Sequence, residues 1–230
     1  MKKQLKKSGV YALTIVFLMS CNAIKNANNT QKGAVIGAAS GAVIGGVVGN
    51  NVGNKKNSVL GAIIGGVVGG AAGAYIGNRM DRQAERIEEE VPGAEVTRVG
   101  EGINVTFDES SGVYFDTGKY SVNSKSQTTL KKLAGVFKEF PDSDILIEGH
   151  TDNVGSETSN MTLSKQRAKS VSSFLINEGL PSKRFTTKWY GEDQPKYNNE
   201  TSKNRAKNRR VELAIVASDK LKKEARKNTQ

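Results

Sequence analysis

The sequence has very few of the residues that build metal centres and disulfide frameworks. Its 230 residues include one cysteine and one histidine. A single cysteine excludes a disulfide within the chain, and a single imidazole excludes any site that needs two histidines. Aromatic residues make up 6% and hydrophobic residues 37% of the chain, below the usual apolar share of a globular protein. We therefore expect no metal, no cofactor and no single large core.

Acidic residues are outnumbered, and the excess of positive charge is unevenly distributed. Lysine and arginine total 34 against 23 acidic residues, a formal net charge of +11. Between residues 200 and 230 there are ten basic and four acidic residues. Such a balance attracts anionic glycans, lipid headgroups or nucleic acid, but no aromatic-rich motif accompanies it, so no nucleic-acid partner is expected. Residues 218–230 are predicted to be a solvated basic tail.

Residues 1–20 have the features of a secretion signal. Four early lysines precede an apolar run from Val10 to Met19, which is too short to span a bilayer as a helix. The next residues, Leu18-Met19-Ser20-Cys21, resemble the lipobox of bacterial lipoproteins. The resemblance implies cleavage before Cys21, its modification with lipid such as palmitate, and, because Asn22 follows, placement at the outer membrane. The alternative is an ordinary signal peptide with an incidental cysteine. Residues 21–32 would form a lipidated linker.

Glycine is concentrated between residues 33 and 77, where 14 of the 25 glycines occur. They recur every four residues in two stretches separated by a polar turn, although glycine inside a helix costs about 1 kcal/mol relative to alanine. Close contact between helices of the small-xxx-small kind can compensate. We predict a glycine-rich helical hairpin over residues 33–78, similar to the glycine-zipper segments of outer-membrane lipoproteins. It is either a membrane-inserted or self-associating hairpin, or a compact helical pair lying against lipid.

The remainder of the chain reads as a stem followed by a folded domain. Residues 79–93 carry many charges and end at Pro92-Gly93, so we predict a helical stem that lifts the next domain off the membrane. Over residues 94–217 strands and helices alternate, which predicts an α/β fold, a two-layer sandwich of mixed β-sheet and helices. The strands are predicted at residues 96–99, 103–107, 113–115, 145–148, 185–190 and 211–216, and the helices at 130–140 and 164–179.

Five ordered motifs in this domain resemble the OmpA-like C-terminal domain. They are Val113-Tyr114-Phe115-Asp116, residues 148–155 (EGHTDNVG), residues 160–168, residues 190–195 and residues 208–212 (NRRVE). The resemblance implies non-covalent binding of peptidoglycan through the diaminopimelate residue of its stem peptide. It also implies a ligand site, which comprises Asp152 and Arg167, the pocket residues Phe115, Asp116, Thr151, Asn160 and Leu163, and Arg210 at the rim.

The chemistry of Asp152 and Arg167 suits that ligand. A free diaminopimelate end carries an ammonium and a carboxylate on one carbon, so its receptor needs an anion beside a planar cation. Asp152 is predicted just beyond a strand, and Arg167 in the first turn of a helix capped by Ser164, where free amides also attract a carboxylate. The alternative is that Asp152 caps a turn and Arg167 is a surface charge. His150 is expected to be packed or hydrogen-bonded. For Arg209, a structural role is as well supported as a role in the site.

These expectations define an outer-membrane lipoprotein that anchors the membrane to peptidoglycan, with its binding domain facing the periplasm. The chain offers no nucleophile, paired carboxylates or metal set for a cell-wall hydrolase, so it is not expected to be an enzyme. The other function left open is that of a membrane-inserted oligomeric scaffold, or a pore-like protein, in which the glycine-rich segment self-associates as a homo-oligomer. The partners expected are peptidoglycan and, through the lipid anchor, the outer membrane.

Overall fold

The computed structural model describes residues 68–107 and 111–229. The signal segment, the lipidation site Cys21, the linker and most of the glycine-rich segment lie outside the described residues. Among the helices that are described, none has both the length and the apolar character that crossing a bilayer requires.

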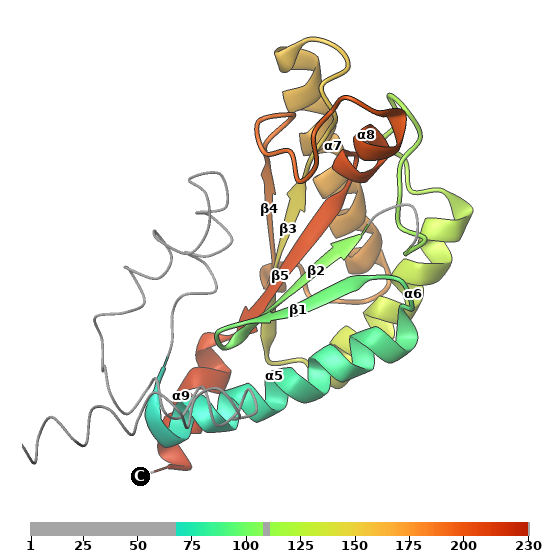
Figure 1. Ribbon diagram of the computed structural model, residues 1–230. Coiled ribbons are helices and arrows are strands. Elements are labelled where there is room, and N and C mark those ends of the chain that lie inside the picture. Colours follow the sequence, from blue (N-terminus) through green and yellow to red (C-terminus); the bar gives the residue numbers. More distant parts are fainter. Residues whose placement is uncertain (1–67, 108–110, 230) are drawn as a thin grey trace, which may run out of the picture.

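A five-stranded mixed sheet organises the domain (Figure 1). The strand order is β1-β2-β5-β3-β4; β3 and β4 pair in parallel, and the other pairs are antiparallel. The expected two-layer α/β fold with a mixed sheet is therefore confirmed. The strands are β1 (Glu95–Val99), β2 (Gly102–Phe107), β3 (Ser143–Gly149), β4 (Phe185–Trp189) and β5 (Val211–Ala217).

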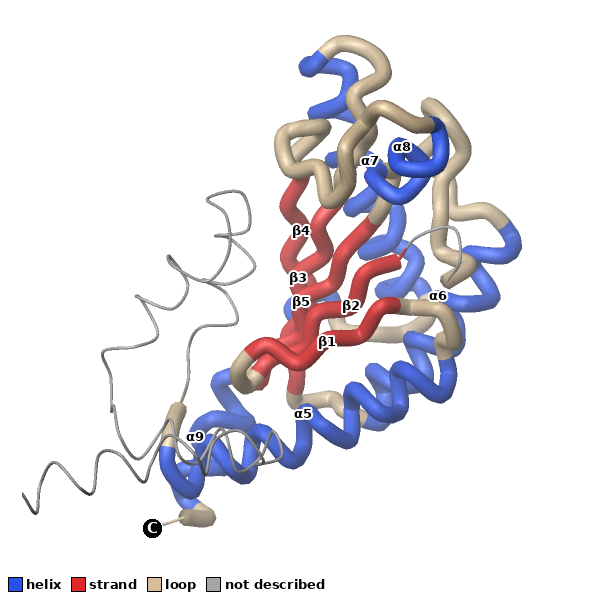
Figure 2. The backbone as a smooth tube through the Cα atoms, viewed as in Figure 1, coloured by secondary structure: helices blue, strands red, loops and turns tan. Residues whose placement is uncertain are grey.

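Helices cover one face of this sheet, as Figures 1 and 2 show. Alternate residues of the strands point to opposite faces, so Ile145 and Ile147 of β3 join the main core while Leu146 lies in a small cluster on the other face. The main core also takes in the apolar sides of the three longest helices. The helices are α5 (Gly70–Glu90), α6 (Ser124–Glu139), α7 (Glu157–Asn177), α8 (Ser202–Asn208) and α9 (Asp219–Lys227), with a short 3-10 turn at Ser182–Arg184.

The predicted helix around residues 130–140 is confirmed as α6, but the strand predicted at 113–115 is wrong. Asn123 caps α6 by accepting a hydrogen bond from the backbone amide of Ser126 at 2.8 Å. Residues 113–123 form a loop that leads into this cap. Phe115 is buried in the main core without belonging to the sheet, and the Arg167 guanidinium lies over its ring.

Helix α7 begins two turns earlier than the sequence predicted. Ser156 is its cap and accepts a hydrogen bond from the Ser159 amide at 3.2 Å. Ser164 is fully buried inside the helix, where its hydroxyl donates to Met161 and accepts from the Gly191 amide. Arg167 consequently lies about three turns into the helix. The free amides of a first turn are not beside it, and that part of the expected site is wrong.

Helix α5 joins the end of the glycine repeat to the expected stem in one continuous element. The boundary predicted between residues 78 and 79 lies inside this helix. Ile76, Met80 and Ile87 on its apolar face are buried in the main core, so residues 79–90 are not a free spacer. A Cβ atom at Gly73 would lie 2.6 Å from a carboxylate oxygen of Glu101, so that side chain would have to shift to admit any other residue.

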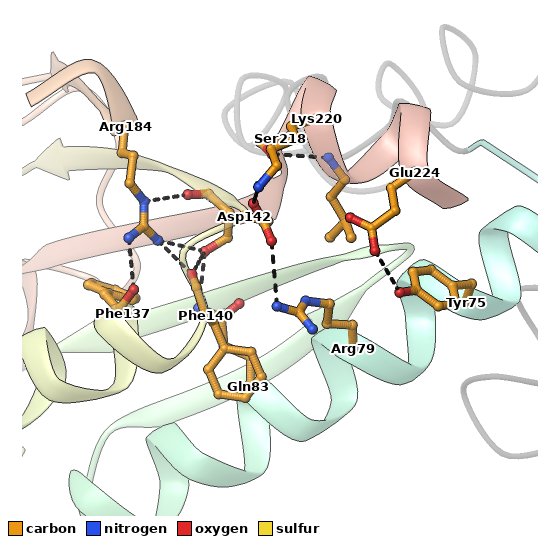
Figure 3. Close-up of polar contacts among 12 residues, drawn as sticks. Tyr75, Arg79, Gln83, Phe137, Phe140, Asp142, Arg184, Ser218, Lys220 and Glu224 are labelled. Carbon is orange, nitrogen blue, oxygen red and sulfur yellow. Dashed lines mark hydrogen bonds and ion pairs between the residues drawn. The ribbon is translucent and has the colours of Figure 1, made fainter. Parts of the chain in front are cut away.

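The C-terminal segment predicted to be a solvated tail is the packed helix α9. Ser218 caps it by accepting from the Leu221 amide at 3.3 Å, and Leu221 and Ala225 are buried. Figure 3 shows the polar contacts between α9 and α5. The Tyr75 hydroxyl donates to Glu224 at 3.1 Å, and Asp142 receives both Arg79 and Lys220.

Candidate functional site

The site lies where β3 ends and the loop toward α7 begins. Asp152 stands on this loop and is only 5% exposed. One of its carboxylate oxygens accepts from the Val154 amide at 3.1 Å, an Asx turn of the kind that aspartate stabilises. The other accepts from Arg209 Nη1 at 2.8 Å. The Arg209 side chain keeps 22% of its surface exposed, so this ion pair reaches the surface on the arginine side.

Arg167 is completely buried next to this pair and ties the loop before α6 and the end of β3 to α7. Its Nε donates to the Lys119 carbonyl at 3.0 Å, Nη1 to the His150 carbonyl at 3.2 Å and Nη2 to the Asp116 carbonyl at 3.3 Å. Burial, and secondarily the charge of Arg209, lower the pKa of Arg167 to about 10, while Asp152 acts in the opposite direction. Arg167 remains charged at neutral pH and fixes the loops around Asp152.

The expected pairing between Asp152 and Arg167 is not what the structure has. Both side chains are described, and they do not form an ion pair with each other. They do lie close enough for the charge of Asp152 to act on Arg167. The direct partner of Asp152 is Arg209, to which the sequence analysis assigned no binding role. The signal that could have identified it is the Asn-Arg-Arg motif, which places two arginines directly before β5.

The remaining predicted pocket residues surround these charges in different ways. Asn160 is buried and its amide donates to the Glu192 carboxylate. Thr151 is buried, and its hydroxyl has no hydrogen-bond partner among the described residues. Leu163 is half-buried, and Asp116 is exposed and contributes its carbonyl.

Arg210 is not at the rim, contrary to expectation. It is 4% exposed, and its Nε donates to Glu212 at 2.5 Å while Nη2 donates to the Gln194 carbonyl at 3.1 Å. Its guanidinium belongs to a buried layer below the site.

That buried layer contains two carboxylates and the single histidine. Glu148 and Glu212 lie opposite each other on β3 and β5, and their oxygens lie within 4.8 Å of one another and of a His150 ring nitrogen. Burial raises the pKa of Glu148 to about 7, and burial with the nearby Arg210 holds the pKa of His150 well below its usual value. Such a donor set could hold a cation, but Arg210 already supplies a positive charge to Glu212.

Two glycines allow α7 to lie close over the strand ends that carry the site. A Cβ atom on Gly149 would lie 2.1 Å from the Ser164 carbonyl oxygen, a distance no real contact allows. Gly191 has a φ of 53°, and a Cβ there would crowd the Met161 amide at 3.1 Å. The glycines of the 148–155 and 190–195 motifs therefore set the distance between the helix and the site.

The C-terminal part of the chain, which holds this site, is similar to the OmpA family. Residues 114–209 match the family model described as the OmpA family, and residues 1–81 match the YMGG-like Gly-zipper. The chain thus matches the OmpA family in its C-terminal part and the glycine zipper in its N-terminal part, a combination that fits an OmpA-like lipoprotein with a glycine zipper.

Named relatives share parts of this domain organisation. The chain is 34% identical over 136 residues to "Probable lipoprotein YiaD" of Escherichia coli (strain K12), which covers 59% of this chain and 62% of the relative. It is 42% identical over 86 residues to "Peptidoglycan-binding protein ArfA" of Mycobacterium bovis, covering 37% of this chain and 26% of the relative. The chain spans less than two thirds of the length of either relative.

Solved structures have the same fold. A MotB-like protein from Desulfovibrio vulgaris superimposes with a TM-score of 0.56 at 21% identity, covering 63% of this chain and 94% of that one. The cell wall anchor of the T6SS from Pseudomonas aeruginosa gives a TM-score of 0.51 at 26% identity, with 61% and 98% covered.

Proposed function

We propose that the protein is a non-catalytic lipoprotein of the outer membrane that anchors this membrane to peptidoglycan, with its OmpA-family domain in the periplasm. The family match and the relative named as peptidoglycan-binding support the wall as the partner. The lipobox at Cys21 and the relative named as a lipoprotein support the lipid anchor. The observation that carries the proposal is the Asp152–Arg209 ion pair at the end of β3.

This ion pair suits the head group of diaminopimelate. An amino acid end carries one ammonium and one carboxylate, so it can insert between the two side chains and give each a new partner of opposite charge. Asp152 would receive the ammonium, and Arg209 would grip the carboxylate with two parallel hydrogen bonds. No buried charge is then left without a partner; a buried charge without one would be costly in free energy.

The other residues of the site support this exchange. Arg167 is a positioning residue, because each of its three guanidinium nitrogens already donates to a backbone carbonyl. The unpartnered Thr151 hydroxyl can bond the bound head group. Phe115, Asp116, Asn160 and Leu163 shape the walls from the loop before α6 and from α7.

Retention of the full-length protein on purified sacculi tests the proposal. Asp152→Asn and Arg209→Gln should each weaken retention roughly thirtyfold or more, the loss expected on removing one partner of a buried charge pair. Asp193→Asn, an exposed aspartate after β4, is the matched control and should bind like the unaltered protein. A free peptide ending in diaminopimelate should compete, and one with lysine at that position should not. Unchanged retention of both site variants would refute the assigned site.

A second function, self-association through the glycine segment, is supported by the zipper match over residues 1–81. Deleting residues 33–66 separates the two functions, because it keeps Cys21 and leaves α5 whole. An anchor should still bind sacculi after this deletion. A scaffold should lose its oligomeric state in detergent, measured by light scattering, while the unaltered protein keeps it.

A further inference from the structure

Helix α9 presents a basic face that the site does not use. Leu221 and Ala225 are buried on one side of the helix. Lys223, Arg226 and Lys227 are exposed on the opposite side, where residues three and four apart are neighbours. Among the described residues none of these three forms an ion pair, whereas the neighbouring lysines do: Lys220 pairs with Asp142 and Lys222 with Asp219.

This face lies where the N-terminal segment enters the domain. The backbone amides of Val68 and Gly69 donate to the Glu101 carboxylate in the β1–β2 turn. The first turns of α5 then contact α9 through Tyr75 and Glu224 (Figure 3). The 67 residues that precede Val68, including Cys21, therefore join the folded domain beside α9.

The site is at the other end of the sheet. Strand β3 starts at Ser143, next to the Asp142 that holds α9, and ends at Gly149 before the Asp152 loop. Seven strand residues span roughly 20 Å. Figure 1 accordingly has α9 and the start of α5 at one end of the molecule and the start of α7 with α8 at the other.

The charges of helix α5 are also unevenly distributed along its length. Arg79 lies in its first half and shares Asp142 with Lys220 of α9. The last two turns carry four glutamates, Glu85, Glu88, Glu89 and Glu90, against one arginine, Arg86. An anionic surface would attract the α9 end of the domain and repel the far end of α5.

We propose that Lys223, Arg226 and Lys227 dock onto the anionic lipid headgroups of the membrane that carries the N-terminus of the chain. The inference rests on the proposed membrane anchor and is independent of the wall ligand. Basic residues gain from an anionic bilayer only within a Debye length of it, and the chain enters the domain at the end that carries this face and not at the end that carries Asp152. Docking turns the opposite end, with Asp152, toward the wall.

Lysine reactivity in lipid nanodiscs tests this with the full-length protein. One set of discs contains phosphatidylcholine alone, and the other contains phosphatidylcholine with phosphatidylglycerol. Lys223 and Lys227 should react with an amine reagent about fivefold more slowly in the anionic discs, the factor that corresponds to the attraction of one basic residue. High salt should abolish the difference. Exposed Lys131 and Lys132 of α6 are internal controls and should react equally in both discs.

Arg226→Glu keeps both reporter lysines and should reduce their protection, whereas Lys132→Glu should not. Equal rates in the two kinds of disc, or equal protection in both, would overturn the proposal. So would protection that requires added sacculi instead of anionic lipid, because the face would then bind the wall. Arg226→Glu should also keep its retention on sacculi, and Asp152→Asn should keep the lysine protection, so failure of the anchor site and failure of lipid docking are distinguishable.

Discussion

At the scale of single residues, Arg167 is a charge that the protein uses for its own structure. Three backbone carbonyls, two from the loop before α6 and one from the end of β3, converge on its guanidinium. Lysine has the same charge but not the planar fork, so Arg167→Lys should leave at least one buried carbonyl without a donor. We expect a loss of about 2 kcal/mol in the free energy of unfolding, measured by urea denaturation. Lys169→Arg, on the exposed side of α7, should change stability little; equal effects would contradict the assigned role.

Glu148 makes the stability of the domain depend on pH. Burial raises its pKa from 4.5 to about 7 in the folded protein, so the folded state binds the proton more tightly than the unfolded state. Its contribution is therefore fully present below about pH 4.5 and is lost as pH rises through about 7, by at most about 3 kcal/mol.

Glu148→Gln should remove this loss. Denaturation of the two proteins between pH 5 and 8.5 should show the difference in unfolding free energy moving in favour of the variant as pH rises. The comparison cancels the opposite contribution of His150, whose lowered pKa favours stability at higher pH. A difference that stays constant across this range would contradict the raised pKa.

Sequence motifs located the region of the site but did not identify the ion pair within it. Asp152, Thr151 and Arg167 were placed around one strand end because each belongs to a local motif. The partner of Asp152 is 57 residues away, and β5 had to be placed beside β3 before Arg209 could be chosen over Arg167. The helix start was misjudged for a related reason: Ser156 and Ser164 are both good caps, and only the contact of Ser164 with Gly191 shows that it lies inside the fold.

At the scale of elements, α5 is the helix for which the structure differs most from the sequence prediction. The glycine period continues through Gly69, Gly73 and Gly77, so the pattern gives no sign that these positions leave the zipper and enter the domain. The charges of residues 79–90 suggested a solvated helix, yet the apolar residues among them follow a helical period and are buried. Helix α9 was missed similarly, because only Leu221 and Ala225 among its nine residues are buried.

The buried face of α5 should therefore matter for stability. Met80→Ala is expected to lower the free energy of unfolding by about 2–5 kcal/mol, the range for a large core side chain replaced by alanine. Arg82→Ala, two residues along on the exposed side of the helix, is the control and should change it by less than about 0.5 kcal/mol. Equal stability of the two variants would show that α5 is a spacer after all.

At the scale of the whole molecule, the folded unit includes α5 and does not begin at residue 94. A fragment of residues 94–230 lacks α5 and leaves exposed the core surface that Ile76, Met80 and Ile87 cover. We expect it to melt at a much lower temperature than a fragment of residues 68–230, or to lack a cooperative transition, when both are followed by circular dichroism. Identical melting curves would contradict the domain boundary drawn from the structure.

The carboxylate of Glu101 holds the chain at the turn between β1 and β2, at the opposite end of the sheet from Asp152. Tension between a membrane and a wall would thus enter at one end of the strands and leave at the other. Adjacent strands loaded in this direction must slide past each other, breaking many ladder hydrogen bonds together instead of one at a time. With the two proposed attachment points at these ends, the sheet would be a mechanical link that resists force in shear.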